Sequence, residues 1–307
     1  MRASTKAWRL RSGFLLVVLA GMLTAFMAVR LNGGPGELSP AQGQTPKAYE
    51  DFNPGTFSRP TVIDNPWFPL RPGMRFTYEG FTEEGGKRLP HRVVFTVTDL
   101  TKVVGGVRAV AAYDLDYSAG KLEEQEIVFF AQDDEGTVWH LGQYPEVYED
   151  GKFVEAPAWV HGLQGARAGI MMKAQPRLGT PSYSQGLALA VNWTDRGVVY
   201  QVGQKTCVPV DCYEDVLVID ETSREEPNAH QLKYYARGVG LVRVGWRGEG
   251  EKTKETLELV KVEQLGPQAL AEVRAAVLNL EKRAYRISKN VYARTPPAEH
   301  TPEAGSP

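Results

Sequence analysis

The chain has 307 residues, which is enough for one large domain or two modest domains with a hydrophobic core. Its 35 lysines and arginines nearly balance its 37 acidic residues, so the formal net charge is -2. This balance gives no strongly basic surface, and we therefore expect no nucleic acid as a partner. The 31 glycines and 20 prolines stand between short apolar runs, as is typical of a protein of strands and turns.

The first residues indicate the cellular compartment. Residues 1–12 contain four basic side chains and no acid, and residues 13–29 contain no charge. A basic flank before an apolar run is typical of a secretory signal or a signal anchor. The run is just long enough for a membrane-spanning helix, and no good cleavage site follows it directly. The sequence therefore predicts a hydrophobic signal-anchor helix over residues 1–31, with a cleaved signal peptide as the alternative.

The same N-terminus predicts where the rest of the chain lies. Because basic residues precede the apolar run, the N-terminus is expected to stay in the cytoplasm while the remainder crosses the membrane. We predict a single-pass protein of the cytoplasmic membrane with its C-terminal domain outside. If the segment is cleaved, the protein is instead secreted or periplasmic.

Two segments lack the patterns of folded structure. Residues 32–59 are rich in glycine, proline and small polar residues without a hydrophobic period, so they are predicted to form a flexible tether. Residues 289–307 end in TPPAEHTPEAGSP, which is polar and rich in proline. They are predicted to form a disordered tail.

Residues 60–265 have the pattern of antiparallel strands. Apolar and polar residues alternate in several runs, for example from Met74 to Tyr78, and turn signals such as Gly105-Gly106 separate the runs. One apolar face per strand is typical of antiparallel sheets. The predicted fold class is therefore mainly β, with one large curved antiparallel sheet that forms a half-barrel or a sandwich-like structure.

Residues 266–288 have a different period. Gly266-Pro267 suits the first turn of a helix, and apolar residues then recur three and four positions apart, from Leu270 through Val277 to Ile287. This spacing predicts a C-terminal amphipathic helix that packs on the sheet. A coiled-coil dimer formed through the same apolar stripe is the alternative.

The two cysteines stand five positions apart in CVPVDC, between two strand-like runs. Two cysteines alone cannot complete a tetrahedral zinc site, and Pro209 does not suit the helix start of a redox pair. The predicted compartment outside the cytoplasm is oxidising. The sequence therefore predicts a disulfide between Cys207 and Cys212 that closes the end of a hairpin.

Four blocks of the sequence resemble a known group of proteins. The blocks are DNPWFPLRPG with the following FTYEG, AQDDEGTVW, GLQGARAGIMMKAQP and YYARGVGLVR. Together, over residues 60–247, they resemble a family of bacterial exported proteins with NP-x-FPL-x-PG and YYA-x-GVG-x-V blocks and no assigned activity. The resemblance implies an envelope protein with a curved antiparallel sheet, similar to lipoprotein carriers that hold acyl chains. His140 and Gly186 depart from the family's aromatic and acidic residues, so no functional residue is carried over.

Candidate catalytic and metal-binding residues are few. Asp114, Asp116 and Ser118 have some likeness to a calcium loop, but their alternation with apolar residues is more typical of a strand end. Glu123, Glu124 and Glu126 have the pattern of a solvated strand face. The five histidines are scattered, without the spacing of a helical metal site. We therefore predict no catalytic, metal-binding or cofactor-binding residues, although strands can bring distant histidines together.

These patterns predict a non-catalytic protein of the cell envelope that binds an apolar or amphiphilic ligand on its sheet. Trp139, Trp159 and Trp246 are the candidates for the apolar face that contacts this ligand. The alternatives are a structural or protein-interaction module anchored at the membrane, and a hydrolase whose site is assembled from distant histidines and carboxylates. The expected partners are the membrane, through the N-terminal helix, and a lipid or another envelope protein.

Overall fold

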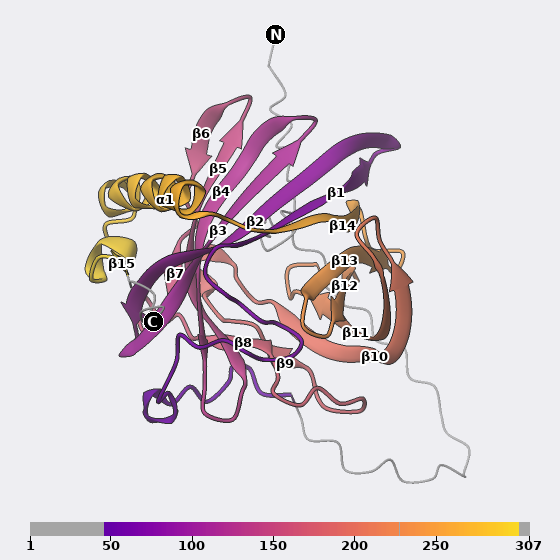
Figure 1. Cartoon of the computed structure of the whole chain (residues 1–307), viewed down its shortest axis with the longest axis horizontal. Coiled ribbons are helices and arrows are strands. Elements are labelled where there is room, and N and C mark those ends of the chain that lie inside the picture. The colour runs from indigo at the N-terminus through magenta and orange to yellow at the C-terminus, as the bar shows by residue number, and fades with distance from the viewer. Residues whose placement is uncertain (1–45, 227, 301–307) are drawn as a thin grey trace, which may run out of the picture.

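The computed structural model describes residues 46–226 and 228–300. Fifteen strands form one sheet, and neighbouring strands run antiparallel. The main path of this sheet runs from β6 through β5, β4, β3, β2, β1, β14, β13, β12, β11 and β10 to β9 (Figure 1). β7 and β8 pair with β5, and β15 pairs with β2. The predictions of a mainly β fold, one large antiparallel sheet and a C-terminal helix are confirmed.

The strands and the helix have the following bounds: β1 (Met74–Glu84), β2 (Lys87–Val104), β3 (Val107–Ser118), β4 (Lys121–Gln132), β5 (Val138–Glu149), β6 (Lys152–Glu155), β7 (Trp159–Val160), β8 (Gly169–Met172), β9 (Tyr183–Ser184), β10 (Arg196–Cys207), β11 (Cys212–Thr222), β12 (His230–Ala236), β13 (Gly240–Arg247), β14 (Lys254–Gln264), α1 (Pro267–Ile287) and β15 (Glu299–His300).

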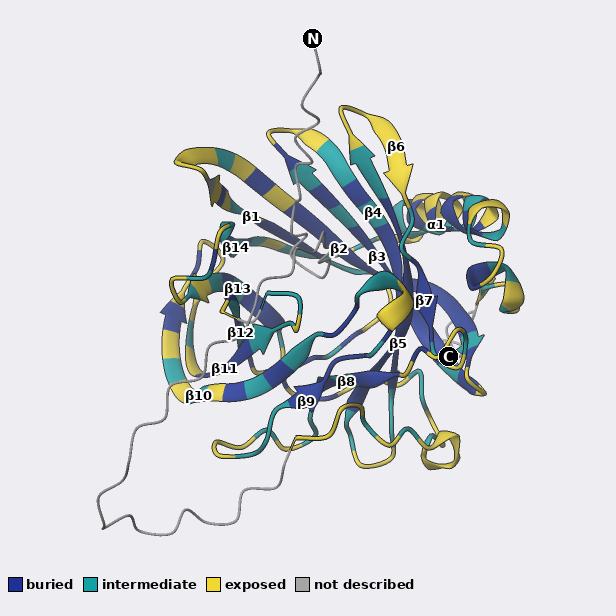
Figure 2. Cartoon of the chain, turned by 180° about the vertical axis from the view of Figure 1, so that it is seen from behind, coloured by how far each residue is buried: buried dark blue, intermediate teal, exposed yellow. Residues whose placement is uncertain are grey.

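The central strands are buried on both faces (Figure 2). On β4, Val128 and Phe130 belong to one apolar cluster, while Ile127 and Phe129 belong to a second cluster on the opposite face. We call the face of Val128 and Phe130 the inner face and the other the outer face. The sequence predicts a single apolar face per strand, and the difference arises because separate parts of the chain cover each face of β2–β5.

The outer face is covered by α1. Val273, Val277, Leu280 and Ala284 are buried in the outer cluster together with side chains of β2–β5. These residues are spaced three and four apart, so they form one stripe of the helix. The predictions of an amphipathic helix and of its packing against the sheet are therefore confirmed.

The segment after α1 packs on the outer face as far as residue 300. The sequence predicts a disordered tail over residues 289–307, so this prediction is wrong for residues 289–300. Tyr292 is fully buried in the outer cluster, and β15 pairs with β2. The Lys102 Nζ on β2 donates to Glu281 Oε1 at 2.7 Å and to the Pro296 carbonyl at 2.5 Å. A buried lysine requires such acceptors. The polar composition of this segment does not reveal that it supplies an acceptor to a lysine far away in the sequence.

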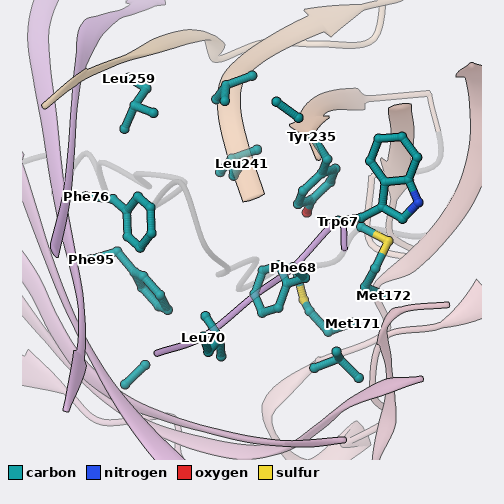
Figure 3. Packing of buried hydrophobic residues seen from close by; sticks show 14 of the residues in the cluster. Trp67, Phe68, Leu70, Phe76, Phe95, Met171, Met172, Tyr235, Leu241 and Leu259 are labelled. Carbon is teal, nitrogen blue, oxygen red and sulfur yellow. The ribbon is translucent and has the colours of Figure 1, made fainter. Parts of the chain in front are cut away.

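Two segments before β1 also pack on the sheet. Trp67, Phe68 and Leu70 enter the inner cluster, where Figure 3 shows them among side chains of the surrounding strands. The ring centroids of Phe68 and Phe130 are 5.4 Å apart. Within the predicted tether, Phe52 packs against Trp139 with ring centroids 5.3 Å apart. The later part of residues 32–59 is therefore docked on the domain rather than free.

The predicted disulfide is confirmed. Cys207 and Cys212 pair in register at the end of the β10–β11 hairpin and are joined by an S–S bond of 2.04 Å. The predicted signal-anchor helix over residues 1–31 lies outside the described residues. Within the described part of the chain, no helix has both the length and the apolar character needed to cross a membrane.

The packing of α1 can be tested with a pair of leucines. Leu280 is fully buried and Leu278 is half-buried. We expect Leu280→Ala to lower the free energy of unfolding by about 2–5 kcal/mol, because it leaves a cavity in the outer cluster. Leu278→Ala should cost only about 1 kcal/mol. Urea unfolding followed by circular dichroism measures both, and equal losses would contradict this arrangement.

Candidate functional site

One end of the inner face carries charged residues in place of apolar ones. The members, which we call the acidic cluster, come from β2, β3, β4 and β14 and are at most 6% exposed: His91, Asp114, Asp116, Glu124, Glu126 and Glu255. In the β3–β4 pairing Asp114 lies opposite Glu126, and Asp116 lies opposite Glu124. Acidic residues therefore face one another across two adjacent strands.

His91 lies between two carboxylates of this cluster. Its Nε2 is 2.7 Å from Asp116 Oδ1, and its Nδ1 is 3.0 Å from Glu255 Oε1. The second contact is at ion-pair distance, but it is not a well-directed hydrogen bond, since neither atom has a hydrogen-bond partner. Burial lowers the pKa of His91, but Asp116 and Glu255 outweigh burial and raise that pKa to about 11. His91 is therefore an imidazolium at neutral pH and cannot serve as a general base.

Asp114 and Glu126 carry buried carboxyl oxygens that lack a hydrogen-bond partner. Asp114 Oδ1 and both carboxyl oxygens of Glu126 are buried without a hydrogen bond. Burial raises the pKa of both groups well above the ordinary range, and neighbouring carboxylates add to the rise. The raised pKa favours the neutral carboxylic acid over the carboxylate at both positions.

A second set of unpartnered polar atoms lies farther along the inner face. The members, which we call the tryptophan group, are His140, Gln143, Trp159 and Trp193, all at most 3% exposed. The ring centroids of His140 and Trp159 are 4.7 Å apart, and those of His140 and Trp193 are 5.7 Å apart. His140 Nε2, both amide atoms of Gln143 and the indole nitrogens of both tryptophans have no hydrogen-bond partner.

His140 is held in its neutral form. Burial lowers its pKa to about 3, against smaller opposing effects of backbone groups at Gln185 and Gly142. Its Nδ1 lies 3.2 Å from the Gln185 carbonyl, so Nδ1–H donates there and Nε2 keeps a free lone pair. The tryptophan group thus offers donors from two indoles and an amide, and acceptors from an imidazole and an amide.

The two sets share adjacent strands. In the β4–β5 pairing Glu126 lies opposite Pro145, Val128 opposite Gln143, and Phe130 opposite His140. Side chains of paired residues stand on the same face of a sheet. Glu126, Gln143 and His140 therefore follow one another along the inner face, and we call Asp114, Glu126 and the tryptophan group together the polar row.

The three predicted ligand-face tryptophans lie in different places. Trp159 belongs to the polar row. Trp139 belongs to the outer cluster, where its Nε1 donates to Asp133 Oδ2 at 2.8 Å. Trp246 is 38% exposed, with Lys254 Nζ 4.7 Å from the centre of its ring. The structure does not bring these three side chains to one surface.

The two departures from the family's pattern do meet. A Cβ atom at Gly186 would lie 2.7 Å from a ring carbon of Trp159 and 2.8 Å from Trp193 Nε1, so only glycine fits here. His140 contacts the same two rings. His140 and Gly186 are therefore parts of one local arrangement, although the sequence separates them.

The prediction of a solvated face at Glu123, Glu124 and Glu126 is wrong for Glu124 and Glu126, which are buried, while Glu123 is half-buried. An acidic residue at every second position of a strand is compatible with a solvent-exposed face and with a buried polar face. The sequence pattern therefore does not distinguish the two. A usable signal does exist. The turn at Ala119-Gly120 places Asp-x-Asp opposite Glu-x-Glu, and four acids in register are unfavourable on an ordinary surface.

Metal binding finds no support in the described residues. Across residues 46–226 and 228–300, no three His, Cys, Asp or Glu side chains are grouped in a way that could hold a metal ion. The calcium-like run at Asp114, Asp116 and Ser118 lies within β3, as the alternative interpretation of a strand predicts.

Comparisons with known proteins add little to this description. No protein-family model and no curated protein matches the chain. A candidate exported protein with a YmcC-like fold from Bacteroides fragilis NCTC 9343 is 14% identical, with a TM-score of 0.38 over 64% of this chain and 98% of that one. A candidate lipoprotein from Parabacteroides distasonis ATCC 8503 is 10% identical, with a TM-score of 0.37 and the same coverage. Similarity at this level does not define a function, and the family resemblance of the sequence blocks stays a prediction.

The state of Glu126 leads to a stability test. A group whose pKa is higher in the folded state than in the unfolded state contributes stability that is fully present below the unfolded-state pKa. This contribution is lost as the pH rises from the unfolded-state pKa through the folded-state pKa. We expect Glu126→Gln to raise the free energy of unfolding by about 1 kcal/mol at pH 8, since the amide donates to neighbouring carboxylates without carrying charge. The decline in stability between pH 5 and pH 9 should also become shallower.

The matched control for this test is Glu79→Gln, because Glu79 is an exposed carboxylate on β1. Its effect should stay within about 0.5 kcal/mol at every pH. Urea unfolding at several pH values measures both variants. A Glu126→Gln protein that is less stable than the parent at pH 8, or that keeps its pH dependence, would refute the description of Glu126.

Proposed function

We propose that this chain is a non-catalytic binding protein of the cell envelope that holds the polar part of an amphiphilic ligand on the inner face of its sheet. The observation that carries this proposal is the polar row. Each buried polar group without a partner costs about 1–3 kcal/mol, and folded proteins leave few such groups. Several unpartnered polar groups on one face of the sheet indicate a site where a ligand supplies the missing hydrogen-bond partners.

The surroundings of the polar row favour an amphiphile over a fully polar ligand. Phe130 and Val128 lie between or beside its members, and the rings of Trp159 and Trp193 flank His140. Aromatic rings combine a large apolar surface with a polar edge. The rest of the inner cluster is filled by the chain's own Trp67 and Phe68, so the ligand's apolar part is expected beside the tryptophans.

Two features support a location in the envelope. The N-terminal sequence has the basic flank and apolar run of an export signal or anchor. The Cys207–Cys212 disulfide is stable in an oxidising compartment and uncommon in the cytosol. A single-pass protein with its folded domain outside fits both features, and cleavage to a secreted or periplasmic form is the alternative.

The other two candidate functions have less support. A structural or protein-interaction module gives no reason for the unpartnered atoms of Gln143 and Glu126 to gather on one face. A hydrolase needs a base that accepts a proton near neutral pH. His91 is held between carboxylates that raise its pKa to about 11, and burial lowers the pKa of His140 to about 3, so neither imidazole is well matched to that role. Ordered water is the remaining competitor for the polar row.

Mass spectrometry under native conditions tests the binding function. Full-length protein extracted gently from its own host should carry a co-purified amphiphile that is released on denaturation. Protein free of any such molecule would favour the interaction module, with water in the polar row.

A pair of glutamines assigns the ligand to the inner face. Gln143→Met removes an unpartnered amide, so it should raise the stability of the ligand-free protein by about 1 kcal/mol while lowering the amount of co-purified ligand. Gln125→Met is the control, because Gln125 accepts from Tyr113 at 2.9 Å and donates to Tyr148 at 2.6 Å. It should destabilise the protein and leave the ligand in place. The opposite pattern would place the ligand elsewhere.

The location has its own test. A reporter enzyme that is active only outside the cytoplasm should be active when fused after Pro307. N-terminal sequencing of the mature protein then separates an anchor from a cleaved signal, because a retained anchor keeps residue 1 or 2 as its start. Activity of a cytoplasmic reporter at the same fusion point would contradict export.

A further inference from the structure

Resting on the proposed function, we infer that the polar part of the ligand is an organic ammonium group, which binds at Asp114 and Glu126 with help from Gln143. The binding function itself requires only that some ligand satisfies the polar row. The inference names the chemical class of the group that enters its acidic end.

The unpartnered atoms at this end are acceptors when the acids are ionised. Asp114 Oδ1 and both oxygens of Glu126 are buried without hydrogen bonds. The two residues lie directly opposite each other on β3 and β4, which brings their Cβ atoms to about 4.5–5.5 Å. An ammonium group carries three donors and one positive charge, so it can bridge two such carboxylates.

Gln143 gives a second observation that does not depend on the acids. Both its amide atoms are buried without a partner, and it lies diagonal to Glu126 in the β4–β5 pairing. Diagonal neighbours on one face are about 7–8 Å apart, within reach of long side chains. Its carbonyl oxygen can accept the third ammonium hydrogen, while its NH2 group can donate to a hydroxyl or carbonyl farther along the ligand.

An organic cation suits this site better than a metal ion. In the part of the chain that the structure describes, no three candidate ligand side chains are grouped to hold a metal. Asp114 and Glu126 also stand beside apolar residues, since Ala112 and Val128 are the next inner-face positions on their strands. Ammonium carried on an apolar chain matches both kinds of neighbour.

Binding should be coupled to proton release. Burial and neighbouring acids raise the pKa of Asp114 and of Glu126 well above the ordinary range, which favours their protonated forms. The ionisable groups that interact with them are Tyr78 on β1, His91 on β2, Asp116 on β3, Glu124 on β4 and Lys233 on β12. Glu255 on β14 contacts His91 from the other side. A cation between the two acids favours their ionised forms, so the protons leave to solvent as the ammonium enters.

Three probes with the same apolar chain separate the head groups. Isothermal titration of the full chain, stripped of any co-purified ligand, is carried out with octylamine, 1-octanol and octanoate at pH 7. We expect octylammonium to bind at least about tenfold more tightly than either of the others. Repeating the titration in buffers with different ionisation enthalpies should reveal released protons with octylamine only.

Two variants locate the effect. Glu126→Gln should reduce the affinity for octylammonium by about tenfold and leave that for 1-octanol unchanged, and Asp114→Asn is the second variant in case the first does not fold. Glu79→Gln should change neither affinity. A variant that folds cooperatively, is at least as stable as the parent and loses only ammonium binding cannot be explained by damage to the fold.

The outcomes are distinct for the two proposals. Equal binding of octylamine and 1-octanol, or tighter binding of octanoate, overturns the ammonium inference while the binding function stands. Binding of none of the three probes also overturns the inference, and the native ligand found by mass spectrometry then decides the binding function. Competition by calcium or magnesium at the same residues would replace the organic cation with a metal.

Discussion

The burial of β2–β5 on both faces is the constraint on which the rest of the structure depends. A strand with one wet face can send every second side chain to water, but these strands cannot. Each polar side chain on them must therefore meet a partner inside the protein or remain unsatisfied. The outer face meets this demand with α1 and the residues after it, and the inner face meets it only in part.

The contrast between two buried glutamates shows the difference. Glu146 on β5 faces outward and accepts from Arg283 at 2.9 and 3.0 Å and from the Tyr144 hydroxyl at 2.9 Å. Glu126 on the adjacent β4 faces inward and has no hydrogen-bond partner. The same chain thus supplies a full set of donors on one side of the sheet and none for Glu126 on the other. Poor packing in general does not account for this contrast between neighbouring strands.

Local patterns in the sequence predict the elements but not the second buried face. The alternation in β1, the apolar stripe of α1 and the Cys207–Cys212 pair follow from nearest-neighbour chemistry, and all three are present. The burial of Glu126 and of Tyr292 depends on segments far away in the sequence, which no local period records. Three tryptophans look alike as apolar residues, yet strand parity and bulges send Trp139 and Trp159 to different clusters.

The pairing of β1 with β14 has a consequence for how the chain reaches this fold. Met74 lies opposite Gln264, so the first long strand closes against the last one. Contacts between residues so distant in sequence make folding slow, because the loop between them must be ordered first. A chain that emerges from its N-terminus presents β2–β5, with an apolar cluster on each face, before β14 and α1 have followed. During that interval the emerging strands are prone to aggregate, and the arrival of β14 and α1 ends this exposure by closing the sheet and covering its outer face.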